Sequence, residues 1–194
     1  DGTIHENTYK VGGMYDKAIT EIVGWLSKAV TVAENEKQAH ALELLIEYYK
    51  TGDLKIWSEY NIAWVSATDG DIDYINSFIE VYNDPLGYSG SFETVVELKD
   101  FKMTDIMSVV SENVQWFEDN APLMANHKKK EVKGVTYKVV DAAGEAGDAS
   151  PSTPIGVNLP NANWIRTQHG SKSVSLGNII NAYDEAGGSG ILTE

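Results

Sequence analysis

Two short segments of the sequence combine residue types that could hold an ammonium group and stabilise an oxyanion. The first ends an alternating apolar run with Glu80 and Tyr82. Alternation along a strand would place these two side chains on one face, where a carboxylate can hold an ammonium group and a phenol can donate to an oxyanion. The second carries Asn158 and Asn161 on either side of Pro160. An Asx-rich turn beside an edge strand remains an alternative interpretation of these residues.

Two further patterns resemble known sites but each lacks a required residue. Asp69, Asp71, Asp73 and Glu80 have the spacing of ligands in a calcium loop, but Tyr74 stands where the sharp turn needs glycine. We therefore interpret them as an acidic turn before a strand. The run Gly-Ser-Lys-Ser at 170–173 lacks the first glycine of a phosphate loop, and its lysine does not follow the glycine directly.

The four histidines do not show the spacing of a metal site. His5 and Glu6 begin like a zinc-protease motif, but no histidine follows at the fourth position after His5. His40, His127 and His169 are scattered along the chain. We therefore predict no metal ligands within this chain.

Composition excludes several classes of protein. The chain has 194 residues, no cysteine and a formal net charge of −14. This charge argues against a nucleic-acid partner, because phosphate contacts need clustered Lys and Arg, and it disfavours an anionic membrane surface. No apolar run approaches the roughly 18 residues that span a bilayer.

Apolar periodicity predicts an α+β fold whose N-terminal part is helical. Apolar residues recur every three to four positions in the first third of the chain, which is typical of helices with one buried face. Alternating or extended runs then predict strands, and the small polar run 141–152 predicts a loop. The predicted helices are 15–33, 36–49, 54–64, 103–117 and 178–183, and the predicted strands are 76–82, 92–98, 135–140 and 155–159.

Three long segments resemble one known family. The segments FIEVYNDPLGYSGSFE and VNLPNANWIRTQHGSKSVSLGNI resemble two stretches of the dipeptidyl peptidase III family, the M49 zinc metallopeptidases, in the same order. The helical segment WLSKAVTVAENEKQAHALELLIEYYKTGDL is similar to the bacterial branch of that family. The resemblance covers most of residues 11–183.

The resemblance implies a fold of two lobes around a wide cleft. One lobe is mostly helical and carries zinc, whereas the other contains a small β-barrel-like core and corresponds to this chain. The family's HExxGH zinc motif is absent here, so we expect an interior piece of a longer protein. The expected parts are a helical segment with the first strands (1–100), a helical excursion toward the zinc lobe (101–134) and a return to the β core (135–194).

The resemblance also implies roles for individual residues. Tyr82 matches the family's catalytic tyrosine, which stabilises the oxyanion during zinc-dependent hydrolysis of the peptide bond. Residues 153–157 match the edge strand along which the family binds peptides. The substrate-binding residues that the resemblance implies are Glu80, Asn158, Asn161, Glu93, Pro154 and Gly156.

The function implied by the resemblance is release of dipeptides from the N-termini of short peptides. This chain would be the substrate-binding lobe, inactive alone, with zinc supplied by the rest of its own polypeptide. The expected partners are short peptides and that zinc lobe, not nucleic acid or a membrane, and the expected location is the cytoplasm. A stand-alone peptide-binding module and a purely structural α+β domain remain alternatives.

Overall fold

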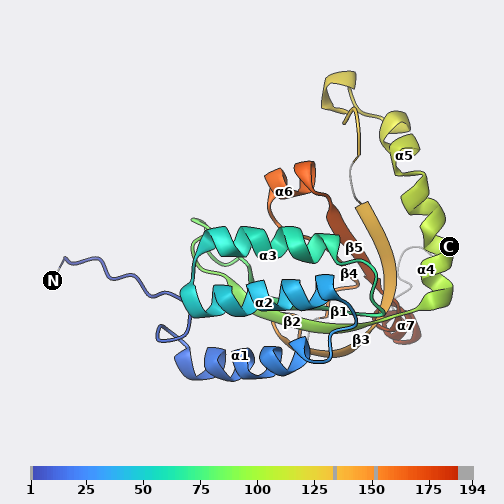
Figure 1. Cartoon of the computed structure of the whole chain (residues 1–194). Coiled ribbons are helices and arrows are strands. Elements are labelled where there is room, and N and C mark those ends of the chain that lie inside the picture. Colours follow the sequence, from blue (N-terminus) through green and yellow to red (C-terminus); the bar gives the residue numbers. More distant parts are fainter. Residues whose placement is uncertain (1, 133–134, 151–152, 188–194) are drawn as a thin grey trace. The chain divides into compact units, whose positions relative to one another are not determined.

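The chain divides into two compact units, Asp1–Gly70 and Asp71–Glu194. The structure is a computed structural model, and it describes residues 2–132, 135–150 and 153–187. Figure 1 shows that the first unit is helical and that the second contains the sheet. None of the described helices is long and apolar enough to cross a membrane.

The first unit consists of three helices, as the periodicity predicts. These are α1 (Asp16–Val30), α2 (Glu36–Thr51) and α3 (Leu54–Ser66). Helix α2 packs against both of the others (Figure 1). Its apolar stripe is buried, which explains why the three-to-four-residue spacing of the sequence predicts these helices correctly.

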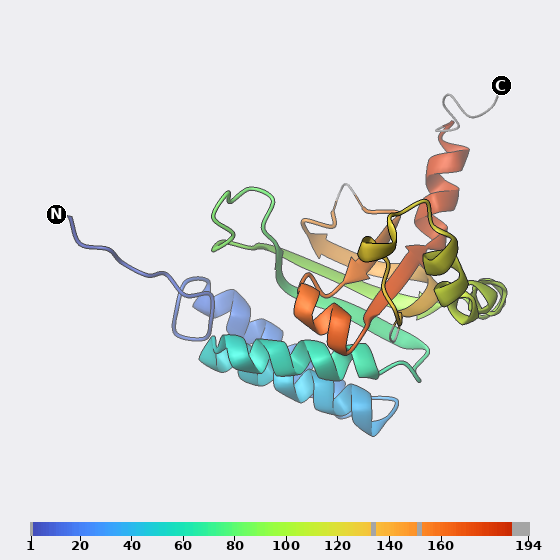
Figure 2. The same ribbon diagram turned by 90° about the horizontal axis from the view of Figure 1, so that it is seen from above.

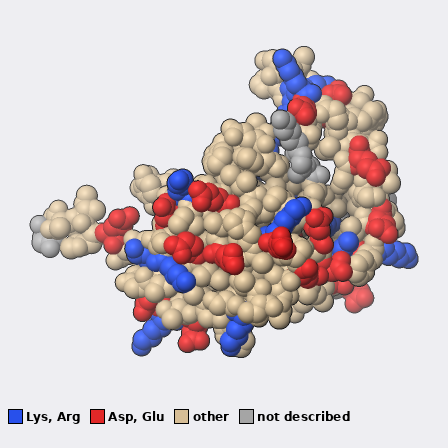
Figure 3. Space-filling view, in the orientation of Figure 1, with Lys and Arg blue, Asp and Glu red and all other residues tan. Residues whose placement is uncertain are grey.

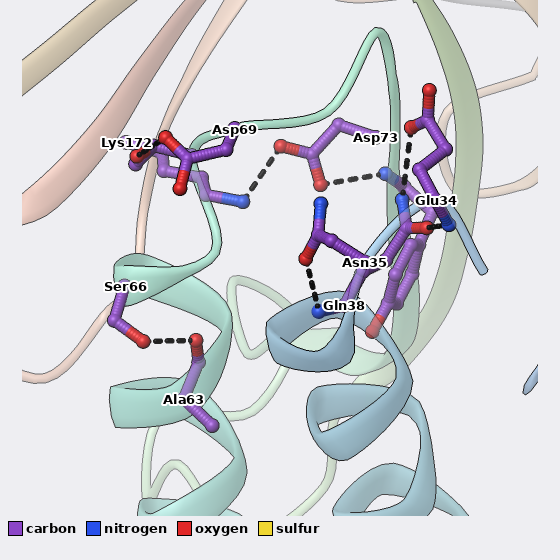
Figure 4. A network of polar contacts seen from close by, with 10 residues as sticks. Glu34, Asn35, Gln38, Ala63, Ser66, Asp69, Asp73 and Lys172 are labelled. Carbon is purple, nitrogen blue, oxygen red and sulfur yellow. Dashed lines mark hydrogen bonds and ion pairs between the residues drawn. The ribbon is translucent and has the colours of Figure 1, made fainter.

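Capping residues determine where these helices begin and end. Before α2, the Asn35 side chain accepts a hydrogen bond from the backbone N–H of Gln38 at 3.0 Å (Figure 4). Before α3, Asp53 accepts one from the N–H of Lys55 at 2.7 Å. Gly52 ends α2 with a φ of 70°, a left-handed conformation that glycine adopts at low cost.

The second unit is built on a five-stranded mixed sheet (Figure 2). Strands one to three are antiparallel neighbours, the third pairs in parallel with the fifth, and the fourth lies antiparallel at the far edge. The spatial order is β1-β2-β3-β5-β4. The strands are β1 (Ile72–Glu80), β2 (Ser91–Lys99), β3 (Val135–Gly147), β4 (Gly156–Leu159) and β5 (Ser171–Leu176).

Helices pack against this sheet and cover part of its core. Helices α4 and α7 both pack against β3. The buried residues Val140, Val174 and Leu176 form a cluster on β3 and β5, and Ile179 of α7 packs against it. The helical elements of this unit are α4 (Phe101–Glu112), α5 (Val114–Asn120), α6 (Asn163–Gln168), α7 (Gly177–Glu185) and the short 3₁₀ turn Ala125–His127.

The predicted loop at 141–152 is wrong over its first half, because β3 continues to Gly147. This stretch pairs with β2 from Lys99↔Val140 to Glu93↔Gly147. Its alanines and glycines resemble a loop in composition, but strand pairing uses backbone groups that every residue carries. A Cβ on Gly147 would lie 2.1 Å from the carbonyl oxygen of Phe92, so only glycine fits this close approach.

The predicted single helix at 103–117 is also wrong, because the structure contains two helices that meet at Asn113. The Asn113 side chain donates a hydrogen bond to the carbonyl of Val109 at 2.8 Å, and its backbone N–H is shared between Val109 and Val110. Side-chain bonds of this kind compete with the regular helix ladder. Helix α6 and strand β5 were not predicted.

Candidate functional site

A pocket of about 280 Å³ lies in the second unit. Its lining includes the predicted catalytic tyrosine and all six residues that were individually predicted to bind substrate. It also contains Asp148, Ala149, Val157 and Leu159, which the sequence analysis did not select. The predicted residues in its lining are Glu80, Tyr82, Glu93, Pro154, Gly156, Asn158 and Asn161.

Strand ends bring these side chains together. Glu80 is the last residue of β1, Glu93 lies on β2, and Asp148 directly follows β3. Asn158 lies on β4, at the opposite edge of the sheet from β1. One pocket can include both edges only if the sheet curls, which agrees with the predicted barrel-like core.

Tyr82 lines the pocket, but the prediction that it shares a strand with Glu80 is wrong. The β1–β2 register shifts between Phe78 and Glu80, and β1 ends at Glu80. Tyr82 therefore belongs to the connecting loop, where it is 81% exposed. Figure 2 shows this loop extending beyond the strands.

Asp84 organises the loop that carries Tyr82. Its carboxylate accepts hydrogen bonds from the backbone N–H groups of Leu86, Tyr88 and Ser89 at 3.0, 2.9 and 2.8 Å. These bonds, with that from Leu86 first, lower the pKa of Asp84 because they favour the charged carboxylate. The loop thus has a defined internal structure although its side chains are exposed.

Edge strand β4 presents its polar side chains to the pocket. Asn158 is exposed while the neighbouring Leu159 is buried, as expected for alternation along a strand. A Cβ on Gly156 would lie 2.7 Å from the carbonyl oxygen of Val174, so a side chain would push β4 away from β5. The peptide bond between Leu159 and Pro160 is cis, and Asn161 follows as an exposed residue.

The pocket is strongly acidic. Among the described residues that line it, Glu80, Glu93 and Asp148 carry carboxylates and none is Lys, Arg or His. Burial, followed by the charges of Glu80 and Asp148, raises the pKa of Glu93 to about 6. A hydrogen bond to Glu80 is the main cause that raises the pKa of Tyr82, so this side chain stays a neutral phenol.

A second group of charged residues lies on the same sheet. Lys172 of β5 forms an ion pair with Asp73 of β1 at 2.6 Å (Figure 4), and Asp73 is directly opposite Glu97 of β2. All three side chains are buried. Burial is the main cause that raises the pKa of Glu97 to about 8, and burial also lowers the pKa of Lys172.

No metal site is found in the part of the chain that the structure describes. No three His, Asp or Glu residues there are placed to bind one ion, and the pocket carboxylates are no exception. The described residues therefore do not fit a zinc ion, and we assign no step of a reaction to one. On the face that Figure 3 shows, acidic side chains are spread over the surface.

Comparisons with known proteins identify the family. Residues 3–192 match the profile of peptidase family M49. Dipeptidyl peptidase 3 from Dictyostelium discoideum is 27% identical over 172 residues, covering 89% of this chain and 24% of that protein. Nudix hydrolase 3 from Arabidopsis thaliana is 30% identical over 125 residues, covering 64% of this chain and 16% of that protein. The solved structure of DPP III from Caldithrix abyssi matches with a TM-score of 0.77 and 28% identity, covering 88% of this chain and 33% of that one.

The fold is thus one that occurs in a peptidase, which confirms the predicted α+β class. The match to the family profile extends over nearly the whole sequence, and the chain belongs to peptidase family M49. It spans about a quarter of the length of the dipeptidyl peptidase 3 that it matches.

Proposed function

We propose that this chain is the substrate-binding lobe of a zinc-dependent dipeptidyl peptidase that releases dipeptides from the N-termini of short peptides. The observation that carries the proposal is the pocket itself. Residues up to 81 positions apart in the sequence, from Glu80 to Asn161, line one space within the second unit. The zinc ligands would lie in the rest of the polypeptide.

The carboxylates and amides of the pocket suit the free ammonium group of a peptide. One carboxylate oxygen of Glu80 is buried and has no hydrogen-bond partner among the described residues. A buried oxygen without a partner is costly, and an ammonium group that donates to it would remove that cost. The amide oxygens of Asn158 and Asn161 supply further acceptors from the opposite edge of the sheet.

Tyr82 would act on the carbonyl group that is attacked. Its phenol is neutral and exposed, so it can donate a hydrogen bond to an oxyanion. In this chain the Glu80 carboxylate is the main cause that raises the pKa of Tyr82, which favours the neutral phenol. A peptide ammonium that binds Glu80 would weaken this interaction and leave the phenol free to donate further along the peptide.

Strand β4 would bind the peptide backbone. Its residues Gly156–Leu159 form an edge of the sheet and pair with β5 on one side only. Pro154 and Gly156 place this edge beside the pocket. A peptide added as a further strand would use the free backbone groups of β4, while the pocket holds its N-terminus.

The helices after β2 provide a surface for the rest of the polypeptide. Five large apolar side chains of α4 and α5 are half or more exposed: Phe101, Ile106, Val109, Trp116 and Phe117. None of the residues of α4 or α5 is buried in this chain. Since the matched relatives are about four times longer, we propose that the zinc lobe covers this face.

The test uses the full-length protein and a peptide with either a free or an acetylated N-terminus. The free peptide should be cleaved two residues from its N-terminus, and the acetylated one should not. Glu80→Gln should raise KM for the free peptide about 10- to 100-fold, because a hydrogen bond to a charged group contributes about 1.5–3 kcal/mol. Glu185→Gln, an exposed glutamate on α7 outside the pocket, should leave KM unchanged. Equal cleavage of the acetylated peptide would contradict the proposal.

A further inference from the structure

Asp148 adds a third carboxylate to the pocket, and its position is fixed by the backbone. Gly147 has a φ of 73° and turns the chain at the end of β3. The backbone N–H of Asp148 then donates to the carbonyl of Phe92 at 2.8 Å. Because Phe92 directly precedes Glu93, this bond holds Asp148 beside Glu93.

Glu93 is the most enclosed of the three carboxylates. It is 6% exposed and lines the pocket, and no hydrogen bond or ion pair is found for its side chain within the described residues. A buried carboxylate without a donor or a cation is unfavourable as an ion, and it either binds a cation or takes up a proton.

Within the described part of the chain, the charged groups that face Glu93 are all acidic. Glu80 faces it from the end of β1, Asp148 from the turn after β3, and Glu97 from further along β2. The phenol of Tyr82 faces it from the loop. Together with burial, the charges of Glu80 and Asp148 raise the pKa of Glu93 to about 6.

We propose that Asp148, together with the enclosure of Glu93 and the neighbouring Glu80, favours a proton on Glu93 in the empty pocket under mildly acidic conditions, and that a bound ammonium group displaces this proton to solvent. The exchange is balanced: the ammonium keeps its own protons, and the Glu93 carboxylic acid becomes a carboxylate. The inference rests on the proposed function in that it takes a peptide ammonium as the ligand. It predicts that binding weakens as the pH falls below about 6.

The test first follows the Glu93 side-chain carboxyl group by ¹³C NMR in the 194-residue chain without ligand. Its titration midpoint should lie near pH 6 and should fall by up to about half a pH unit in Asp148→Asn, which removes one of the repelling charges. Asp105→Asn, an exposed aspartate of α4, should leave the midpoint unchanged. A midpoint near 4.5, or one that Asp148→Asn does not move, would overturn the inference.

The second measurement uses alanyl-alanine amide as the probe, with its N-acetylated form as the control. Calorimetry at pH 6 in two buffers of different ionisation enthalpy should show release of about half a proton per bound probe, because Glu93 is then half protonated. Asp148→Asn should reduce this release. Binding without proton release would overturn the exchange and leave the proposed function standing. Failure of the free probe to perturb the pocket signals would contradict both.

Discussion

Strand β2 carries two buried glutamates whose surroundings differ in charge. Glu93 and Glu97 are four residues apart on the same face of the strand. Beside Glu97 lies the ion pair of Lys172 and Asp73 at 2.6 Å. Among the described residues, the charged groups that act on Glu93 are Glu80 and Asp148, both acidic.

The two regions differ in whether the chain itself supplies a cation. Near Glu97 the chain supplies its own ammonium group, which pairs with Asp73, while burial raises the pKa of Glu97 to about 8. Near Glu93 the same type of carboxylate has an opening to solvent and no cation from the described chain. The ion pair thus shows within one molecule the contact that we propose between the pocket and a peptide ammonium.

The largest effect is expected when the internal ammonium group is removed. Lys172→Met should destabilise the chain by about 3–5 kcal/mol, because it leaves Asp73 as a buried charge without its cation. Urea unfolding measures this directly. Lys102→Met, an exposed lysine on α4, serves as the control and should change stability by no more than about 0.5 kcal/mol. A loss below about 1 kcal/mol for Lys172→Met would mean that the pair is not an essential part of the sheet.

A second effect should separate the two glutamates by pH. Folding raises the pKa of Glu97 from 4.5 to about 8, so the native state keeps a proton that the unfolded state has lost. Stability should therefore fall as the pH rises from about 4.5 to about 8. Glu97→Gln should remove the fall between about pH 6 and 8 and reduce the fall below 6, whereas Glu93→Gln should reduce only the fall between about 4.5 and 6.

Urea unfolding of the three proteins across pH 4–9 measures these slopes. The wild-type chain should show the full decrease in stability with rising pH. Each glutamine variant should lose the part of this decrease that its own glutamate causes. Identical profiles for the two variants would show that the two glutamates do not differ as the structure indicates.

The smallest effect concerns the loop beside the pocket. Asp84→Asn replaces a carboxylate that accepts three backbone N–H groups by an amide with one acceptor oxygen. The amides of Leu86, Tyr88 and Ser89 should then exchange with solvent faster, as measured by hydrogen exchange. Asp141→Asn, exposed at the middle of β3, should leave these amides unchanged. Unaltered exchange in Asp84→Asn would show that other contacts hold the loop.

Much of the first unit could be predicted from the sequence because its helices bury one regular stripe. The second unit was harder to predict from the sequence. The strand at 141–147 carries small residues, and its pairing depends on the backbone of β2, which no side-chain pattern reveals. The break between α4 and α5 at Asn113 comes from a local side-chain hydrogen bond, which the spacing of apolar residues does not indicate.

The site residues were predictable to the extent that they lie in recognisable segments. Tyr82 was placed on a strand because alternation says nothing about the register shift before Glu80. Asp148 was not predicted as a site residue because it lies in a run of small polar residues. Lys172 could have been found: in 171–176, Lys172, Val174 and Leu176 alternate with serines, which is typical of a strand with Lys172 on its buried face.

The most direct test of the central claim compares Tyr82→Phe with Tyr88→Phe in the full-length protein. Tyr88 is equally exposed on the same loop but does not line the pocket. Loss of the Tyr82 phenol should lower kcat for a short peptide by roughly 10²–10³ with little change in KM, because one oxyanion donor is removed. Tyr88→Phe should keep the parental kcat. An unchanged kcat in Tyr82→Phe would contradict the assignment of this pocket to the active site of a dipeptidyl peptidase.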